Sequence, residues 1–497
     1  MDWKHLKSGT DIRGVALDGP NGEQVDLTDE VVEQIGAAFA VWLCEKTEKQ
    51  PDELTVSVGR DSRLSGPRMR DAIVNALCDA GIKVIDCGLA STPAMFMTTV
   101  DLDCDGAVQI TASHHPYYRN GLKFFLPSGG LEGAQITEIL AIAAEGKRLP
   151  RQNGKLKTEK YMNTYAARLR KMICEEVNAA DYEYPLAGTH IVVDAGNGVG
   201  GFYATKVLEP LGADVTGSQF LDPDGSFPNH IPNPEDKDAM ASVSAATLRA
   251  AADLGVIFDT DVDRAGCVDN HGLEINRNRL IALAAYIALE KYPGGTVVTD
   301  SVTSDGLKTF IETTLGGRHC RFKRGYKNVI GEAVRLNNAG IVSPLAIETS
   351  GHAALMDNYF LDDGAYLITK IIILMAKLRE RGRNLTDVIA SLPEPAETKE
   401  LRFDITREDF AAYGNDILTD LEKYANARGW AVADDSREGV RISFGEDEGD
   451  GWLLLRLSVH DPVMPLNIES NRVGGCDEIF AHLSGFLADK TGLRLPQ

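Results

Sequence analysis

The sequence has 497 residues and is acidic, with 73 Asp and Glu against 51 Lys and Arg and a formal net charge of −22. This charge argues against nucleic acid and anionic membranes as partners, because both would repel the protein. The length suffices for roughly three or four domains, and no apolar run approaches the length of a membrane-spanning helix. The eight cysteines are scattered without a C-x-x-C pair, and the first residues lack the apolar core of a signal peptide. We therefore expect no zinc site or disulfide framework, and a cytoplasmic protein with reduced thiols.

The first third of the sequence has the pattern of an α/β unit. It predicts an amphipathic helix over residues 31–43, a strand at 54–58, a helix over 69–77 and a strand at 83–86. Strand, helix and strand at this spacing predict a parallel sheet with right-handed crossovers.

Residues 108–111 predict another buried strand, which leads into the serine segment Thr111-Ala112-Ser113-His114-His115-Pro116. Taken alone, Ser113 is as compatible with a turn as with a nucleophile. No G-x-S-x-G motif surrounds it, which argues against the triad of a hydrolase.

A charged stretch over residues 145–160 predicts a linker, after which a strand at 190–194 opens a second α/β unit. The glycine loop at 196–201 has the G-x-G-x-x-G spacing of a dinucleotide site. However, the next predicted strand, 213–216, leads into Gly217-Ser218-Gln219 rather than into the acid that would hold a ribose. The sequence therefore favours close packing of a helix on a strand over nucleotide binding.

The apolar run 255–258 predicts a buried strand that delivers three aspartates and an arginine, namely Asp259, Asp261, Asp263 and Arg264. Alternation along a continuing strand would place the three carboxylates on one face. Carboxylates that close repel one another, and a divalent cation is the natural compensation. A solvated acidic turn is the other interpretation of this spacing.

Residues 278–292 begin a third unit, in which a strand at 296–299, a helix from Asp305 and a long amphipathic helix over 362–381 repeat the α/β pattern. From Lys399 onward, several short strands and two helices, 410–428 and 479–487, predict an antiparallel sheet with helices on one side. The basic segment 322–327 is either a surface patch or a phosphate or sugar contact, and we favour the second.

Four of these segments resemble the active-site loops of the α-D-phosphohexomutases, the phosphoglucomutase and phosphomannomutase superfamily. Residues 111–116 resemble the phosphoserine loop T-[AG]-S-H-N-P, with His115 at the usual Asn position. Residues 259–264 match the metal loop D-x-D-x-D-R in full, and residues 348–352 resemble the sugar-reading E-x-S-G-H. Residues 456–462 resemble the phosphate loop R-x-S-x-T-E-P, with His460 and Asp461 at the Thr and Glu positions. The loops occur in the family's order, and the resemblance covers essentially the whole chain.

The resemblance implies an α/β protein with three similar α/β domains with mixed or parallel sheets and a C-terminal α+β domain, arranged around a central cleft. We expect domain boundaries at 1–157 (phosphoserine loop), 158–271 (metal loop), 272–393 (sugar loop) and 394–497 (phosphate loop).

The resemblance also implies an isomerase-class enzyme that interconverts hexose 1-phosphate and hexose 6-phosphate, of glucose or mannose or both. It would act through a phosphoserine and a hexose 1,6-bisphosphate, which also serves as activator. Alternatives are a glucosamine or N-acetylglucosamine phosphate mutase, a metal-dependent sugar-phosphate phosphatase, and a non-catalytic sugar-phosphate binder. The last is disfavoured because the serine and all three aspartates are intact. The partners would be small hexose phosphates, with neither nucleic acid nor membrane, for a monomer or a small homo-oligomer.

By resemblance, Mg²⁺ is expected on Ser113, Asp259, Asp261 and Asp263, and catalytic roles fall on Ser113, His114, Lys123, Arg13 and Arg264. The substrate-binding set comprises Lys323, Arg324, Tyr326, Lys327, Glu348, Ser350, His352, Arg456, Ser458 and His460. The general base stays open among His114, Lys123 and His352, with Lys323 or Lys327 as replacements. Bacterial members often place a lysine just after the third domain's first strand, where this sequence has Asp300-Ser301-Val302-Thr303-Ser304.

Overall fold

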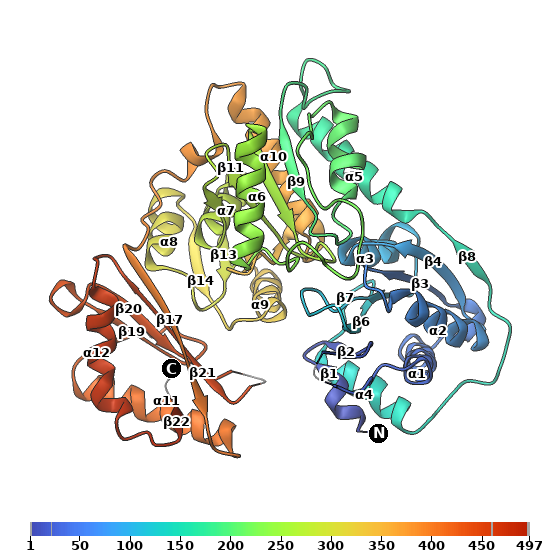
Figure 1. Ribbon diagram of the computed structural model, residues 1–497, viewed down its shortest axis with the longest axis horizontal. Helices are drawn as coiled ribbons and strands as arrows, with labels where there is room; N and C mark the ends of the chain where they lie inside the picture. The colour runs from blue at the N-terminus through green and yellow to red at the C-terminus, as the bar shows by residue number, and fades with distance from the viewer. Residues whose placement is uncertain (1, 21, 459–460, 495–497) are drawn as a thin grey trace. The chain divides into compact units, whose positions relative to one another are not determined.

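The computed structural model describes residues 2–20, 22–458 and 461–494 (Figure 1). His460, expected in the phosphate loop, lies outside the described residues. Four β-sheets with flanking helices organise the described part of the chain, as the sequence predicts. Among these residues, every helix is too short or too polar to span a bilayer.

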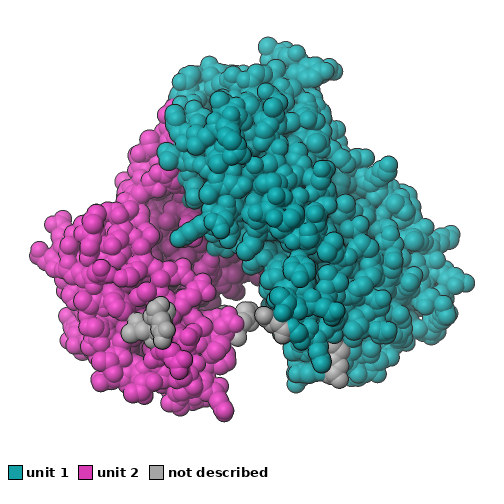
Figure 2. Space-filling model, viewed as in Figure 1, with its two compact units in different colours: residues 1–276, 350–353, 361–385 teal, residues 277–349, 354–360, 386–497 magenta. Residues whose placement is uncertain are grey.

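The chain divides into two compact units (Figure 2). The first comprises Met1–Asn276, Ser350–Ala353 and Leu361–Leu385, and the second comprises Arg277–Thr349, Ala354–Phe360 and Thr386–Gln497. The four expected domain boundaries and the central cleft stay predictions.

The first sheet joins parallel strands to an antiparallel edge, in the order β1-β2-β6-β5-β3-β4-β8 with β7 beside β6. β3 runs parallel to β4 and β5, so the predicted parallel sheet is confirmed. The strands are β1 (Lys7–Ser8), β2 (Asp11–Val15), β3 (Thr55–Arg60), β4 (Lys83–Leu89), β5 (Gly106–Ile110), β6 (Arg119–Leu126), β7 (Gly129–Gly130) and β8 (Leu156–Thr158). The helices are α1 (Asp29–Thr47), α2 (Gly66–Asp79), α3 (Thr92–Asp101) and α4 (Gly133–Ala144). The charged stretch expected as a linker contributes β8, which pairs with β4.

The second sheet has the order β12-β11-β10-β9, with β9 parallel to β10 and the other strands antiparallel. Its elements are β9 (Ile191–Asp194), β10 (Leu254–Phe258), β11 (Ala265–Asp269), β12 (Glu274–Ile275), α5 (Tyr161–Val177), a π-helix (Tyr203–Leu208) and α6 (Lys237–Ala250). Helix α10 (Gly364–Arg379) returns from later in the chain to pack against α5, and Tyr165 Oη donates to Asp363 at 2.7 Å.

The strand predicted at 213–216 is wrong, because the structure gives this segment a single isolated bridge, from Asp214 to His190, and the next bridge, from Gln219 to Asp194, lies beyond it. The N–H of Thr216 donates to the side chain of Asp214 at 2.8 Å, and therefore cannot continue a ladder. Gly212 and Gly217, at φ +87° and +88°, turn the chain at both ends of the segment.

The third sheet has the order β14-β13-β15-β16, with β13 parallel to both β14 and β15. Its elements are α7 (Asn278–Lys291), β13 (Thr296–Thr299), α8 (Asp305–Thr309), a π-helix (Phe310–Thr314), β14 (Arg318–Arg321), α9 (Tyr326–Asn338), β15 (Leu345–Ile347) and β16 (Ala353–Leu355). Short 3₁₀ turns complete the chain at Trp3–Leu6, Pro51–Glu53, Glu209–Leu211, Met356–Asn358, Leu385–Val388 and Glu446–Glu448.

The fourth sheet is antiparallel, in the order β18-β19-β20-β21-β17-β22. Its elements are β17 (Glu397–Ile405), α11 (Phe410–Ala427), β18 (Ala431–Val432), β19 (Val440–Phe444), β20 (Gly451–Leu455), β21 (Val463–Ser470), α12 (Gly475–Leu487) and β22 (Leu493–Arg494). Residues such as Leu453 and Leu455 pack with both helices in one apolar core, because alternate residues of a strand share a face. The predicted sheet with helices on one side is confirmed.

Glu469 on β21 makes the stability of this sheet depend on pH. Burial raises the pKa of Glu469 from 4.5 to about 7, although Arg441 and a hydrogen bond from Trp452 Nε1 at 2.9 Å oppose this. An acid with a raised pKa binds a proton on folding, so its contribution to stability declines as the pH rises from about 4.5 through about 7. We expect Glu469→Gln to remove this decline and to raise the melting temperature above neutral pH, measured by thermal unfolding at several pH values. Glu422→Gln, at an exposed position of α11, is the control and should keep the pH dependence of the wild type. A melting temperature that varies with pH in Glu469→Gln as it does in the wild type would contradict the expectation.

Candidate active site

The serine loop follows β5 and holds Ser113 in a strained backbone conformation. Ser113 is 3% exposed and has a φ of +52°, a left-handed conformation that costs a non-glycine residue about 1–2 kcal/mol. Its N–H donates to Thr111 Oγ1 at 2.9 Å, and its hydroxyl donates to Asp259 Oδ2 at 3.0 Å. Such strain persists only where the surroundings over-determine it, and it clusters at functional sites.

Arg63 supplies much of that support, and the sequence reasoning missed it. Its fully buried guanidinium donates to the backbone carbonyls of Ser113, His115 (2.7 Å), Pro116 (2.8 Å) and Arg119 (2.9 Å). Asp61 completes the support by pairing with Arg63 at 3.2 Å and accepting from Thr111 Oγ1 at 2.7 Å. Their position in the sequence could have revealed them. Asp61 and Arg63 come directly after β3, at the carboxyl ends of the parallel strands, where binding sites commonly form in α/β proteins.

The metal loop follows β10 and brings three buried carboxylates together. The oxygens of Asp259, Asp261 and Asp263 all lie within 4.8 Å of one another. Between them Val262 has a φ of +65°, an outlier for a β-branched residue. The acidic cluster is therefore buried and strained, so the interpretation as a solvated turn is wrong.

The glycine loop at 196–201 packs against this metal loop. Val199 N donates to Thr260 O at 2.9 Å, and a Cβ on Gly198 would lie 2.6 Å from the same oxygen. Close backbone approach accounts for the glycine at this position, and it occurs here between two loops rather than between a helix and a strand.

The charges in this cluster are only partly balanced by the protein. Lys123 Nζ lies 2.5 Å from Asp263 Oδ2 and 3.3 Å from Asp261 Oδ2. Burial and the neighbouring carboxylates raise the pKa of Asp259 well above its usual value. Burial opposes ionisation of Asp263 as well, but Lys123 beside it holds the pKa of that carboxyl below its usual range.

A hard divalent cation fits the remaining carboxylate oxygens. Asp261 Oδ1 and Asp263 Oδ1 are buried and have no hydrogen-bond partner within the described residues. Buried carboxylate oxygens that lack donors are costly unless a cation meets them, and oxygen ligands suit Mg²⁺ or Ca²⁺.

Arg264 connects the two loops. Its Nη2 donates to Ser113 Oγ at 3.2 Å and to His114 Nδ1 at 2.6 Å, and its Nε donates to Asp259 Oδ2 at 3.2 Å. Burial and the adjacent Arg264 lower the pKa of His114 to about 2. His114 is therefore neutral with Nδ1 as an acceptor, which makes it a weak base. Arg13, held by Asp11 at 2.8 Å, contributes to the same lowering and so lies near this centre.

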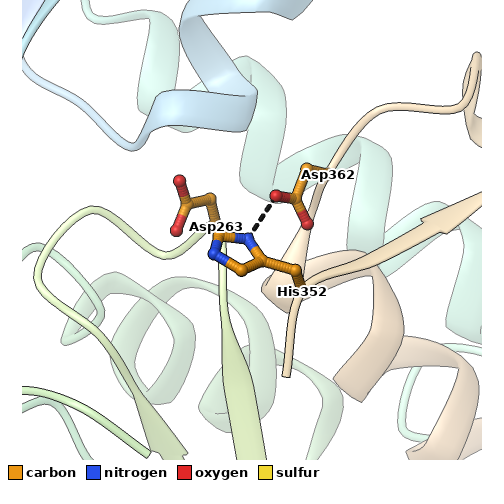
Figure 3. Close-up of side chains that lie close together, drawn as sticks. All are labelled: Asp263, His352 and Asp362. Atoms are coloured by element: carbon orange, nitrogen blue, oxygen red, sulfur yellow. Dashed lines mark hydrogen bonds and ion pairs between the residues drawn. The ribbon is translucent and has the colours of Figure 1, made fainter. Parts of the chain in front are cut away.

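His352 lies between two carboxylates (Figure 3). Its Nδ1 contacts Asp362, which the sequence reasoning missed, and Asp263 lies on the other side. Burial disfavours the imidazolium, but Asp362 and Asp263 outweigh it and raise the pKa of His352 to about 9. The imidazolium pairs with Asp362, and the nearby Asp263 stabilises its charge further. Nothing in the sequence distinguishes Asp362 from its neighbour Asp363, which caps helix α10 by accepting a hydrogen bond from Tyr366 N.

The sugar loop lies at the carboxyl end of β15. Glu348 is 3% exposed, and its Oε1 accepts from Gly325 N at 2.6 Å, just before α9. This contact joins Glu348 to the basic segment, in which Lys323 is exposed and Arg324, Tyr326 and Lys327 are half-buried. Ser350, which belongs to the first unit, is buried, and its hydroxyl has no hydrogen-bond partner among the described residues.

The described part of the phosphate loop follows β20. Arg456 Nη1 lies 3.6 Å from Glu438 Oε1, and burial lowers the pKa of Arg456. Ser458 N donates to Val463 O at 2.9 Å, and Asp461 N donates to Ser458 Oγ at 3.3 Å. Arg456 and Ser458 thus lie just beyond the end of β20, with Ser458 bonded to the start of β21.

Comparison with known proteins gives consistent matches. Family models described as Phosphoglucomutase/phosphomannomutase, alpha/beta/alpha domains I, II and III match residues 5–149, 163–272 and 276–396. A phosphomannomutase/phosphoglucomutase of Pseudomonas putida is 31% identical over 451 residues, 90% of each chain. A phosphoglucomutase of Neisseria gonorrhoeae is 30% identical over 472 residues, 94% of each chain. A crystal structure of a phosphoglucomutase/phosphomannomutase family protein from Burkholderia thailandensis superposes with a TM-score of 0.81 at 27% identity, covering 99% of both chains.

Proposed function

The chain belongs to the phosphoglucomutase/phosphomannomutase family and is a phosphohexomutase, and from this premise we propose that it interconverts the 1- and 6-phosphates of glucose, mannose or both. The reaction would pass through a phosphorylated Ser113 and a hexose 1,6-bisphosphate, which also acts as activator. The observation that supports this most is the 3.0 Å contact of Ser113 Oγ with Asp259 in the metal loop, 146 residues away in sequence.

In the proposed cycle, phosphorylated Ser113 donates to the free hydroxyl of a hexose monophosphate. The bond from phosphorus to Ser113 Oγ breaks, a bond to the sugar oxygen forms, the hydroxyl proton passes to a base, and Ser113 Oγ takes up a proton. After the bisphosphate has turned, Ser113 Oγ gives up its proton and takes the other phosphoryl group, the sugar oxygen that loses this group is protonated, and the second monophosphate leaves. Arg264, within reach of Ser113 Oγ, would neutralise charge on the transferring group throughout.

The family is metal-dependent, and the buried acidic cluster can bind a metal. We take the cation to be Mg²⁺, held by Asp259, Asp261, Asp263 and an oxygen of phosphorylated Ser113. When bound, the cation would stabilise the charge that develops on the phosphoryl oxygens.

For proton transfer, His352 and His114 both stay candidates, each with a different limit. Asp362 at Nδ1 of His352 stabilises the imidazolium, so His352 would have to lose its proton before it could act as the base. His114 Nδ1 already accepts from Arg264. Lys123 is paired with two carboxylates, and Lys323 and Lys327 remain open as alternatives.

Sugar recognition would rest on Glu348 and Ser350. Thr349 between them is already engaged, since its hydroxyl donates to Asp300 Oδ2 at 2.7 Å. The test is a coupled assay on glucose, mannose and glucosamine 1-phosphates, each with its 1,6-bisphosphate, alongside phosphate release. Rapid isomerisation of glucose or mannose phosphate is expected. Dominant phosphate release would indicate a phosphatase, and preference for glucosamine phosphate would overturn the choice of hexose.

Arg456 is proposed to grip the distal phosphate of the substrate. We expect Arg456→Ala to raise KM roughly 10- to 100-fold, because a charge-assisted hydrogen bond is lost. The variant should also release free bisphosphate, measured by anion-exchange chromatography, because the intermediate is held less firmly while it turns. Arg402→Ala is the control. It removes the same charge from an exposed position on β17 of the same sheet, and it should leave the KM and the release of bisphosphate unchanged. An unaltered KM without bisphosphate release in Arg456→Ala would show that this loop is not the phosphate clamp.

A further inference from the structure

A carboxylate already occupies the neighbourhood of the proposed phosphate-binding arginine. Glu438 lies on the turn between β18 and β19, and its Oε1 is 3.6 Å from Arg456 Nη1. The side chains of Glu438 and Arg456 are only 14% and 11% exposed. This pair is therefore largely shielded from water, unlike the exposed ion pairs that contribute little.

The other oxygen of Glu438 is held by donors from the third sheet's loops. Ser301 Oγ donates to Glu438 Oε2 at 2.7 Å, and Arg324 N donates to the same oxygen at 3.0 Å. Arg324 lies just before α9, a helix of 13 residues. A hydroxyl, a backbone N–H near a helix N-terminus and a guanidinium are the donors that proteins use to bind phosphate.

The backbone places Glu438 next to Arg456. Gly439 has a φ of +66°, and a Cβ there would lie 2.1 Å from Leu455 O and 2.8 Å from Arg456 Cα. The turn that carries Glu438 thus lies directly against the strand end that carries Arg456. Only glycine at 439 permits this approach, so the backbone keeps Glu438 beside Arg456 while the Glu438 side chain can still move.

We propose that Glu438 is an internal anion that competes with the substrate's phosphoryl group for Arg456. Phosphate binding at Arg456 displaces the carboxylate, because two anions cannot share one shielded guanidinium without strong repulsion. Glu438 thereby weakens the grip on the distal phosphate, which favours turning of the bisphosphate and release of product. This inference rests on the role of Arg456 given under the proposed function.

The test is the affinity of the full-length protein for inorganic phosphate, by calorimetry, together with KM for glucose 1-phosphate. Glu438→Gln keeps the shape of the side chain and removes the competing charge. The dissociation constant for phosphate and the KM for glucose 1-phosphate should therefore each fall about tenfold. Glu438→Asp keeps the charge but withdraws it by one methylene, and should give a smaller decrease. Asp435→Asn is the matched control on the same turn, since Asp435 pairs with Lys308 at 3.7 Å and Arg321 at 3.9 Å. The dissociation constant for phosphate and the KM of Asp435→Asn should stay within about twofold of the wild type, because an ion pair at the surface contributes little free energy.

The double variant Glu438→Gln/Arg456→Ala tests the competition by Glu438 separately from the proposed role of Arg456 in phosphate binding. With Arg456 absent, the Glu438→Gln change should no longer strengthen phosphate binding. If Arg456→Ala alone leaves phosphate affinity unchanged, the proposed role of the phosphate loop fails. If Arg456→Ala weakens binding but Glu438→Gln leaves it unchanged or weakens it too, the competition by Glu438 is refuted while the loop's role stands. A gain in affinity equal to that of Asp435→Asn would also refute it, because the effect would then be general charge removal.

Discussion

Replacement of Ser113 by alanine is expected to lower mutase turnover by on the order of 10³-fold or more, the usual cost of losing a nucleophile. Ser113 Oγ is the hydroxyl that lies within hydrogen-bond reach of both Asp259 and Arg264. The fold should survive, because alanine and serine pay a similar cost for the left-handed backbone and Arg63 still holds the loop. Intact-mass analysis should find one phosphoryl group on the wild type and none on Ser113→Ala.

Ser62→Ala provides the control for this experiment. Ser62 is also buried in the first domain, but its hydroxyl has no hydrogen-bond partner within the described residues. Its loss should leave turnover and phosphorylation near those of the wild type. Substantial turnover in Ser113→Ala, or a phosphoryl group retained on it, would contradict the assignment of the nucleophile.

Asp261→Asn is expected to lower turnover at least about 100-fold, more than the loss of an outer partner of a metal ligand typically costs. The amide keeps the shape of the side chain but withdraws charge from a cluster whose oxygens lie within 4.8 Å. Chelator should abolish wild-type turnover, and added Mg²⁺ should restore it. Because a cation that binds only the folded state stabilises it, Mg²⁺ should raise the melting temperature of the wild type more than that of the variant.

Asp269→Asn is the control for the metal experiment, because it removes one aspartate charge outside the metal loop. Asp269 is buried at the end of β11 and accepts from the backbone of His271 and Leu273, contacts that an amide oxygen can keep. Its response to Mg²⁺ should equal that of the wild type. Turnover that is indifferent to chelator, or an equal thermal shift in Asp261→Asn, would exclude a functional cation on the metal loop.

Local patterns predicted much of the fold because hydrophobicity and its periodicity can be followed along a short stretch of sequence. The strands predicted before Ser113 and Asp259 form β5 and β10 as expected, and every residue of both strands is buried. The strand predicted at 213–216 failed because Asp214 captures the N–H of Thr216, a side-chain contact that hydrophobicity does not encode. The role of α10 was also not predictable, since its partner α5 lies about two hundred residues earlier, with Lys370 bound to Glu176.

The sequence by itself determined the family and the chemical groups, because serine, carboxylates and arginine occur there at spacings that have a chemical meaning. Only the tertiary structure decided how those groups are held and charged. Arg63 reaches the serine loop across 50 residues, Asp362 turns His352 into a paired imidazolium, and Glu438 meets Arg456 through a glycine turn. The physical reason is that pKa values, strain and ion pairing depend on burial and on distances in space, and residues far apart in the chain supply both.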